Sequence, residues 1–556
     1  MQAKDVVDLF IRHSYITDEQ GEHFLHEAAT GKEIHTVFKE AGIIEDKDQI
    51  FGVLAEDIGA EFMDLTRFIP DDALLKMVPG DLAQTKGVFP LKAEEGVVYV
   101  GMINPFDAQA LEDLRFALGK DAVPVAADTT KVQRLLDEYY SRDTTEDMAQ
   151  ILGEIEAAQG VTAGDQDEDD PNAAPIVRFV DLVLYQAVKE GASDIHFEPF
   201  EDDFKIRYRV DGSLIEMAPP PAHLANTVTS RIKVVSNLNI AEKRLPQDGR
   251  LTTSIGGRPI DMRVSTLPTI HGESVVLRVL DQGSVNLDLE VLGLPPDIKA
   301  FVDDVIVRPN GIFIVTGPTG AGKTTTLYAC LRKINSIEDK LLTVEDPVEY
   351  NVEGIIQVQV NDAIDVTFSR VLRAFLRQDP DRIMVGEMRD GETVQIAVQA
   401  SLTGHLVLST LHTNDAAGAV TRLLDMGSEP FLLAATMEGI LAQRLLRRIC
   451  ADCRTPYEPT PELLKQLDLT QADIGDKEFF TGAGCDECGN SGYKGRKGIF
   501  ELLRINEPMK ELVTERAPTV VIQQKAVELG MVTIRQDGLR NIYAGDSSIE
   551  EVLKYT

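Results

Sequence analysis

The stretch G-I-F-I-V-T-G-P-T-G-A-G-K-T-T-T, from Gly311 to Thr326, decides the fold of this chain. Its apolar residues 312–315 predict a buried strand, and a glycine-rich turn then leads into a helix that begins at Lys323. Both the spacing and the strand-to-helix context match the motif G-x-x-x-x-G-K-[ST], through Gly317, Gly322, Lys323 and Thr324. The sequence therefore predicts a phosphate-binding loop (P-loop) for a nucleoside triphosphate.

This loop is expected to bind phosphate mainly through its backbone. Glycines let the N–H groups turn inward, and the start of the helix adds positive potential. Lys323 is expected to reach the β and γ phosphates, and the Thr324 hydroxyl to complete the Mg²⁺ shell. The predicted ATP-binding residues are Gly317, Pro318, Thr319, Gly320, Ala321, Gly322, Lys323, Thr324 and Thr325.

Length and composition limit the remaining possibilities. A chain of 556 residues is too long for one core and is expected to form about three or four domains. Its 91 acidic and 55 basic residues give a net charge of −36, which opposes nucleic-acid binding unless a local basic surface overrides it. The sequence contains neither a signal-peptide pattern nor an apolar run of about eighteen residues. We therefore expect a cytoplasmic protein.

The pattern of apolar residues changes along the chain and predicts five segments. Residues 1–60 have helical periodicity, and residues 61–140 alternate short strands and helices, as in an interaction domain. Residues 141–174 are poor in large apolar side chains and carry an acidic run, which predicts a flexible linker. Residues 175–290 predict an α+β domain with arginines on or beside its strands. In residues 295–556, predicted strands at 312–316, 341–344, 383–385 and 406–410 alternate with helical patterns, which indicates a mostly parallel sheet.

Three further segments place polar groups at the ends of predicted strands, where ligands bind in open α/β sheets. T-V-E-D-P-V-E-Y (343–350) offers three carboxylates of the kind that orient or deprotonate water. D-R-I-M-V-G-E-M-R-D (381–390) ends a buried strand in Glu387, which can contact Mg²⁺ or its water shell. T-G-H-L-V-L-S-T-L-H-T-N (403–414) delivers His412, which could sense the γ phosphate. The alternatives are, respectively, a structural Asp-Pro turn, a helix-capping glutamate and a structural histidine.

Two C-x-x-C pairs form a second strong signal, namely Cys450 with Cys453 and Cys485 with Cys488. Four thiolates suit tetrahedral Zn²⁺ in a closed structural site, and redox disulfides are the alternative. Because the two pairs are far apart in sequence, the insert at about residues 450–490 is expected to fold as a separate projection from the rest of the domain. The remaining cysteine, Cys330, is predicted to lie in the core.

Taken together, these motifs resemble the secretion ATPase superfamily, and within it the assembly ATPases of type II secretion systems and type IV pili. The resemblance extends from about residue 172 to 515 and also includes G-A-S-D-I-H-F-E-P and R-L-P-Q-D-G-R. It implies a RecA-like P-loop NTPase domain preceded by a PAS-like α+β domain. It further implies that Glu349 is the general base, that Glu387 places Mg²⁺ and water, and that His412 senses the γ phosphate. Arg263 and Arg278 match family arginines that contact the triphosphate.

The same resemblance implies a homohexameric ring with the ATP site between two domains. It implies that the ring hydrolyses ATP and thereby drives an inner-membrane platform protein to add subunits to a filament. Assembly motors carry the tetracysteine insert, whereas retraction motors lack it. Residues 62–140 resemble an N-terminal domain that docks on a membrane-anchored partner at the inner face of the bacterial inner membrane. The corresponding segment 8–13 lacks the R-L-G start of the family's cyclic di-GMP motif, which argues against binding of that second messenger.

Two other functions compete with filament assembly. A P-loop ring motor acting on nucleic acid is one, and the acidic composition and the tetracysteine insert disfavour it. A scaffold that binds nucleotide without hydrolysing it is the other, but Glu349, Glu387 and His412 are all present. The motifs do not distinguish a secretion pseudopilus from a type IV pilus, since both kinds of motor share them.

Overall fold

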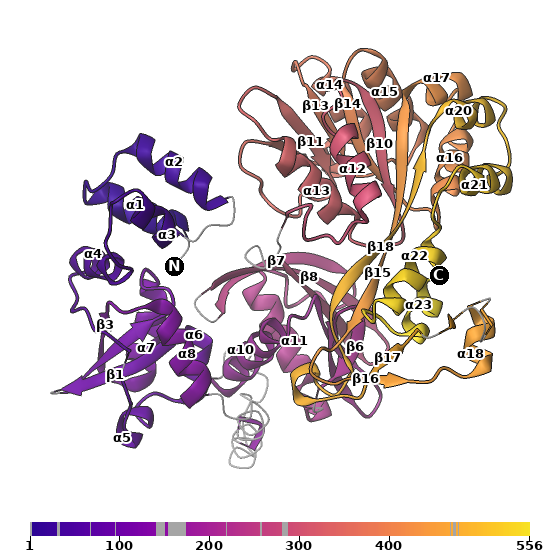
Figure 1. Ribbon diagram of the computed structural model, residues 1–556. Coiled ribbons are helices and arrows are strands. Elements are labelled where there is room, and N and C mark those ends of the chain that lie inside the picture. Colours follow the sequence, from indigo (N-terminus) through magenta and orange to yellow (C-terminus); the bar gives the residue numbers. More distant parts are fainter. Residues whose placement is uncertain are drawn as a thin grey trace. The chain divides into compact units, whose positions relative to one another are not determined.

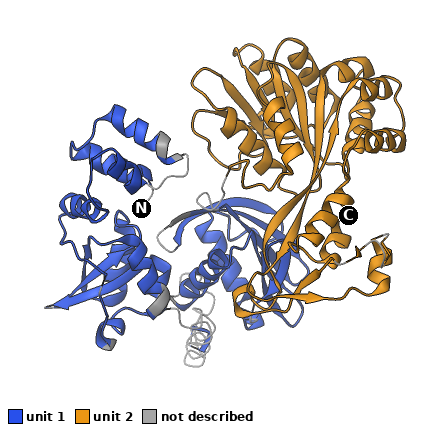
Figure 2. Ribbon diagram, viewed as in Figure 1, with its two compact units in different colours: residues 1–282 blue, residues 283–556 orange. Residues whose placement is uncertain are grey.

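The computed structural model of this protein describes residues 3–29, 34–66, 68–94, 96–140, 151–153, 174–217, 220–255, 258–280, 287–467, 469–470, 474–475 and 477–556. The chain divides into two compact units, 1–282 and 283–556 (Figure 1 and Figure 2). Apart from 151–153 and 174, the predicted linker 141–174 lies outside the described residues. Among the described residues, no helix has both the length and the apolar character needed to cross a bilayer.

Unit 1 begins with short helices and continues with a small sheet. The helices are α1 (Ala3–Arg12), α2 (Asp18–Ala29), α3 (Ile34–Glu40) and α4 (Asp48–Ile58). Their apolar faces form one core, in which Leu9, Phe10 and Phe38 are almost fully buried. The sheet has the order β1-β2-β3, from strands Val88–Glu94, Val97–Met102 and Asp121–Val125. Its accompanying helices are α5 (Asp72–Leu75), α6 (Gly80–Lys86), α7 (Ala108–Leu118) and α8 (Thr129–Tyr139).

The rest of unit 1 is a six-stranded antiparallel sheet of order β6-β5-β4-β9-β8-β7 with two helices. Alternate residues of these strands are apolar and pack with the helices into one core, so the class is α+β, as predicted. The elements are α10 (Ala174–Lys189), β4 (Asp194–Pro199), β5 (Phe204–Val210), β6 (Ser213–Glu216), α11 (Ala225–Val235), β7 (Gln247–Ile255), β8 (Arg258–Thr269) and β9 (Gly272–Leu280).

Unit 2 is built around a seven-stranded sheet of order β12-β11-β13-β14-β10-β15-β18. All neighbouring strands are parallel except β15 and β18. Helices cover both faces (Figure 1), and successive residues of β10 (Gly311–Thr316) therefore enter two different cores. Burial on both faces explains why this strand is a continuous apolar run. The multidomain α/β class predicted from the sequence is confirmed.

The remaining elements of unit 2 follow in chain order. They are α12 (Pro296–Val305), α13 (Lys323–Ile334), β11 (Leu341–Glu345), β12 (Ile356–Gln359), α14 (Phe368–Phe375), β13 (Arg382–Val385), α15 (Gly391–Leu402), β14 (Leu406–Leu411), α16 (Ala416–Asp425), α17 (Pro430–Thr436), β15 (Met437–Ile449), β16 (Arg454–Tyr457), α18 (Pro461–Gln466), β17 (Phe479–Gly482), β18 (Tyr493–Arg504), α20 (Glu507–Thr514), α21 (Thr519–Glu528), α22 (Ile534–Tyr543) and α23 (Ile549–Tyr555). The long β15–β18 pair carries the cysteine insert between its strands. Within that insert, β16 and β17 form a separate two-stranded sheet.

Candidate functional site

The P-loop connects the end of β10 to the start of α13, which begins at Lys323 as the sequence predicts. Gly317 has φ +148°, and a Cβ there would lie 2.4 Å from the backbone O of Gln443. Only glycine therefore fits at this position. Farther along, Thr326 Oγ1 in the first turn of α13 donates to Gln443 Oε1 at 2.7 Å, so β15 lies against both the start of the P-loop and the start of α13.

Lys323 is almost buried and turns back onto its own loop. Its Nζ donates to Gly317 O at 2.8 Å and to Pro318 O at 3.0 Å, and lies 3.5 Å from His412 Nδ1. Burial lowers the pKa of Lys323 to about 8, because desolvation disfavours the ammonium form. A polyanion in the loop would reverse that effect, so this lysine is placed to respond to phosphate.

Glu387 lies at the meeting point of the three predicted segments. His412 Nε2 lies 2.7 Å from Glu387 Oε2, and Arg389 forms an ion pair with the other carboxylate oxygen. The same Arg389 reaches Asp346 Oδ2 at 3.1 Å. A neutral His412 with its proton on Nε2 can donate to Glu387 while Nδ1 accepts from Lys323. The structure thus brings Lys323, Glu387 and His412 into one hydrogen-bonded chain.

The three carboxylates of segment 343–350 have different surroundings. Glu345 is 2% exposed and accepts from the hydroxyls of Tyr328 and Thr343 and from Gln357 Nε2. It is enclosed by donors and is therefore a structural carboxylate. Asp346 is engaged by Arg389. Glu349 is half-buried, and its backbone N–H donates to the Tyr328 hydroxyl at 3.3 Å.

The four cysteines of the insert come together beyond the ends of β15 and β18. All four Sγ atoms lie within 4.8 Å of one another. The separations of Cys450 from Cys485 and of Cys453 from Cys488 are both 3.8 Å. A tetrahedron with Zn–S bonds of about 2.3 Å has S···S edges of about 3.8 Å, so the thiolates fit Zn²⁺. Cys330 is fully buried in the core beside β10, as predicted.

Arg263 and Arg278 lie on neighbouring strands of the six-stranded sheet in unit 1. Arg263 is directly opposite Arg278 in the β8–β9 register, and Arg250 is directly opposite Arg263 in the β7–β8 register. On the other side of Arg278 stands Asp194, whose Oδ1 accepts from Arg278 Nε at 3.1 Å. Arg250, Arg263 and Arg278 thus stand next to one another on neighbouring strands, with Asp194 beside Arg278.

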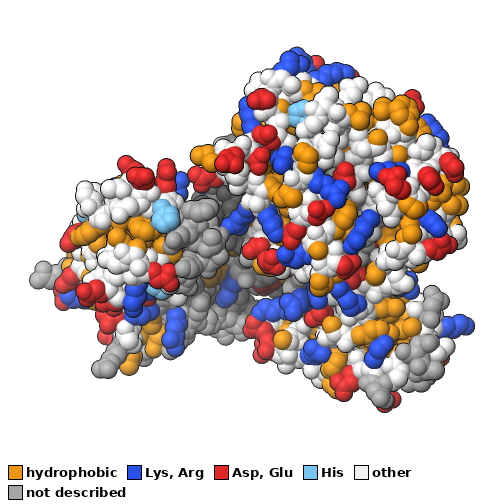
Figure 3. Space-filling model, turned by 45° about the horizontal axis from the view of Figure 1, so that its top comes forward, with side chains coloured by type: hydrophobic (Ala, Val, Ile, Leu, Met, Phe, Trp, Pro, Cys, Tyr) orange, Lys and Arg blue, Asp and Glu red, His pale blue; other side chains and the backbone are white. Residues whose placement is uncertain are grey.

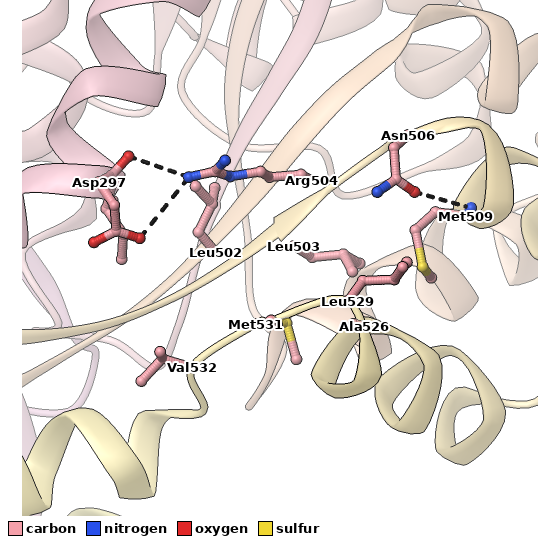
Figure 4. A pocket seen from close by; sticks show the side chains of 12 residues that line it. Asp297, Leu502, Leu503, Arg504, Asn506, Met509, Ala526, Leu529, Met531 and Val532 are labelled. Atoms are coloured by element: carbon pink, nitrogen blue, oxygen red, sulfur yellow. Dashed lines mark hydrogen bonds and ion pairs between the residues drawn. The ribbon is translucent and has the colours of Figure 1, made fainter.

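A separate pocket of about 330 Å³ opens elsewhere in unit 2 (Figure 4). Apolar side chains from β18, α20 and the α21 end line it, and Arg504 spans it to Asp297 O at 3.2 Å. None of the predicted ATP-binding or metal-binding residues belongs to its lining. This pocket is therefore distinct from the candidate site.

Sequence reasoning missed three residues that shape the site: Tyr328, Arg389 and Gln443. Arg389 follows Glu387 closely in the chain, and that proximity was the available signal. Tyr328 sits in the second turn of α13, where an aromatic residue ordinarily indicates core packing. Gln443 comes from a strand far along the chain, so its place beneath the loop depends on the sheet order.

Comparison with known proteins agrees with this geometry. A sequence model described as type II/IV secretion system protein matches residues 169–554. The chain belongs to this family. Within the type II/IV secretion system family, the type IV pilus assembly ATPase PilB of Myxococcus xanthus is 40% identical over 99% of this chain and 98% of its own length. The type II secretion system protein E of Dickeya dadantii is 46% identical over 87% of this chain and 97% of its own length. The resemblance inferred from the motifs is confirmed.

Two further matches concern the domains of this family member. A model of the MshEN domain matches residues 58–146, which overlap the small sheet of unit 1. The X-ray structure of the Legionella pneumophila ATPase DotB matches with a TM-score of 0.52 at 22% identity, over 70% of this chain and 96% of that chain. This likeness shows a shared fold.

Proposed function

We propose that this chain is an ATPase that uses hydrolysis of ATP to drive assembly of a type II secretion pseudopilus or a type IV pilus. One observation carries the proposal: a P-loop lysine, a glutamate and a histidine meet at the carboxyl edge of a parallel sheet. Their contacts are the chain Lys323–His412–Glu387. Relatives named for type IV pilus assembly and for type II secretion support the choice of process.

Each residue has a role in hydrolysis under this proposal. The loop from Gly317 to Thr325 cradles the triphosphate with its N–H groups, and Lys323 turns from its own carbonyls to the β and γ phosphates. Thr324 and Glu387 would hold Mg²⁺, which supplies charge neutralisation to the phosphate oxygens when bound. The site offers both an oxygen ligand at the helix start and a carboxylate, which fits that ion.

The proton transfer is assigned to Glu349, which orients and deprotonates the attacking water. The resemblance of segment 343–350 to the corresponding segment of the family supports the choice of Glu349. His412 would sense loss of the γ phosphate through its contacts with Lys323 and Glu387. Arg263 and Arg278 would bind the triphosphate charge, which their like-charged row favours.

The resemblance extends the proposal to the assembly. The chain would act as a homohexamer at the cytoplasmic face of the bacterial inner membrane. Its motor would move an inner-membrane platform protein, and the N-terminal domain would dock on a membrane-anchored partner. Zn²⁺ held by the four cysteines would stabilise the insert, as their Sγ separations support.

The test is ATP turnover of the purified protein and of Glu349→Gln. The variant should bind ATP normally and lose turnover by several orders of magnitude, because only the base is removed. Turnover equal to that of the wild type would refute the assignment of Glu349 as the base.

Adding double-stranded DNA should leave the ATP turnover of the wild-type protein unchanged. Acidic and basic side chains are interspersed on the face shown in Figure 3, rather than gathered into one basic band. Strong, salt-sensitive stimulation by DNA would favour a nucleic-acid motor instead.

A further inference from the structure

A buried tyrosine connects the helix that starts at the P-loop with the segment that carries Glu349. Tyr328 lies in the second turn of α13, and its side chain is fully buried. Its hydroxyl contacts Glu345 Oε2, accepts the N–H of Glu349 at 3.3 Å and accepts Gln357 Nε2 at 3.4 Å. One hydroxyl on α13 thus contacts the end of β11, the edge strand β12 and the Glu349 segment.

The direction of these hydrogen bonds is determined by Glu345. An ionised carboxylate only accepts, and Glu345 Oε1 already accepts from Thr343 Oγ1 at 2.6 Å and from Gln357 Nε2 at 3.2 Å. The single proton of the Tyr328 hydroxyl therefore points at Glu345, which leaves its lone pairs for the Glu349 N–H. Burial, together with the Glu345 carboxylate, raises the pKa of Tyr328 well above its usual value, so the hydroxyl keeps its proton at neutral pH.

Gln357 holds the next residues of the same segment. Its Nε2 donates to Tyr350 O at 2.9 Å, and its Oε1 accepts from Val352 N at 2.8 Å. The Tyr350 ring meets the Tyr328 ring edge-on, with centroids 5.9 Å apart. Two side chains, Tyr328 and Gln357, therefore hold three backbone groups in residues 349–352.

We propose that Tyr328 is a positioning residue for ATP hydrolysis, acting through the backbone of Glu349. This inference rests on the proposed role of Glu349 as the base. Thr324, proposed to bind Mg²⁺, lies one helical turn before Tyr328 on α13. The same rigid helix thus presents the phosphate site at its start and the anchor of the base in its second turn. It sets the distance between the base and the bound triphosphate.

This arrangement predicts an effect on turnover without an effect on ATP binding. Among the described residues, the Tyr328 hydroxyl hydrogen-bonds to Glu345, Glu349 and Gln357 and to none of the P-loop residues from Gly317 to Thr325, so we expect the phosphate cradle to stay intact without it. A shift of about 1 Å in a reacting group can reduce a rate by about a hundredfold. Tyr328→Phe removes the hydroxyl and keeps the ring, which releases the Glu349 backbone.

The experiment compares Tyr328→Phe with Tyr208→Phe in the purified full-length protein. Tyr208 is also fully buried, and its hydroxyl donates to Val183 O at 2.7 Å in unit 1, far in sequence from the P-loop. Tyr328→Phe should lower kcat about tenfold or more and leave the KM for ATP within about twofold. The dependence of kcat on pH should keep its shape around neutral pH, since the raised pKa of Tyr328 keeps its hydroxyl protonated there. Tyr208→Phe should keep both constants at wild-type values.

A second variant tests the same hydrogen bonds through Gln357, which lies on the edge strand β12, so that its replacement should leave the core packed. Gln357→Leu should also lower kcat at constant KM, whereas Gln359→Leu, on the same exposed strand, should not. The inference is overturned if Tyr328→Phe and Gln357→Leu both keep kcat within twofold of wild type while Glu349→Gln is inactive, or if KM rises in parallel with the loss of kcat. An active Glu349→Gln would instead refute the base assignment itself.

Discussion

Replacing Gly317 with alanine should distort the P-loop, whereas the same replacement at Gly320 should be mild. The two glycines are matched, because both lie in the loop and both have positive φ, +148° and +79°. A Cβ at position 317 would lie 2.4 Å from Gln443 O and 3.2 Å from Ala321 Cβ. A Cβ at position 320 would meet nothing within 4 Å. The pair therefore compares a crowded position with an open one in the same loop.

The magnitude follows from these two terms. An L-residue at either φ costs about 1–3 kcal/mol. Gly317→Ala adds overlap with a carbonyl of the neighbouring strand β15, which cannot rotate away, and overpacking of this kind costs about 1–3 kcal/mol more. With about 2–4 °C per kcal/mol for a domain of this size, Tm of unit 2 should be about 2–12 °C lower in Gly317→Ala than in Gly320→Ala.

The assay is calorimetric unfolding of both nucleotide-free variants, combined with titration of a fluorescent ATP analogue. Gly317→Ala should also bind the analogue more weakly than Gly320→Ala, because relief of the overlap moves the loop N–H groups that we propose to bind phosphate. Equal Tm and equal affinity in the two variants would refute the reasoning, since the loop would then relax around the new Cβ without consequence.

Three other outcomes are expected. Above a pH of about 8, ATP affinity should fall by up to about tenfold per pH unit, because the pKa of Lys323 is lowered to about 8 in the empty loop and a bound triphosphate favours the charged form. Lys323→Met should bind ATP weakly at every pH. A wild-type affinity that does not change with pH would contradict the role of Lys323 in binding phosphate. Cys485→Ser should lose zinc in metal analysis, and only its insert should become sensitive to proteolysis. Cys330→Ser is the control that should keep its metal. Full zinc in Cys485→Ser would argue against the four-thiolate site. Arg250→Gln should raise the stability of unit 1 by up to about 0.5 kcal/mol in denaturant unfolding, because it removes a like charge opposite Arg263, and a lower stability would show that Arg250 has a favourable partner.

The elements around the P-loop could be predicted because their signals are local. Four predicted strands, 312–316, 341–344, 383–385 and 406–410, appear within β10, β11, β13 and β14. Each is a short, mostly apolar and buried run, and a polar residue, namely Thr316, Glu345, Glu387 or His412, lies at or just beyond its carboxyl end. The order of the strands could not be read in this way. It places β15, from far along the chain, beside β10 and beneath the loop.

The sequence by itself determined the P-loop motif, the spacing of the four cysteines and the family, because motif spacing and apolar periodicity are properties of consecutive residues. Its residues offered three carboxylates in 343–350, and only the family resemblance singled out Glu349 as the base. Only the tertiary structure decided that Glu345 is buried among donors, that Arg389 links Glu387 to Asp346, and that Tyr328 holds the backbone of Glu349. The physical reason is that burial and hydrogen-bond partners depend on how α13 and β12 pack against β11, and this packing brings together residues that are distant in the chain.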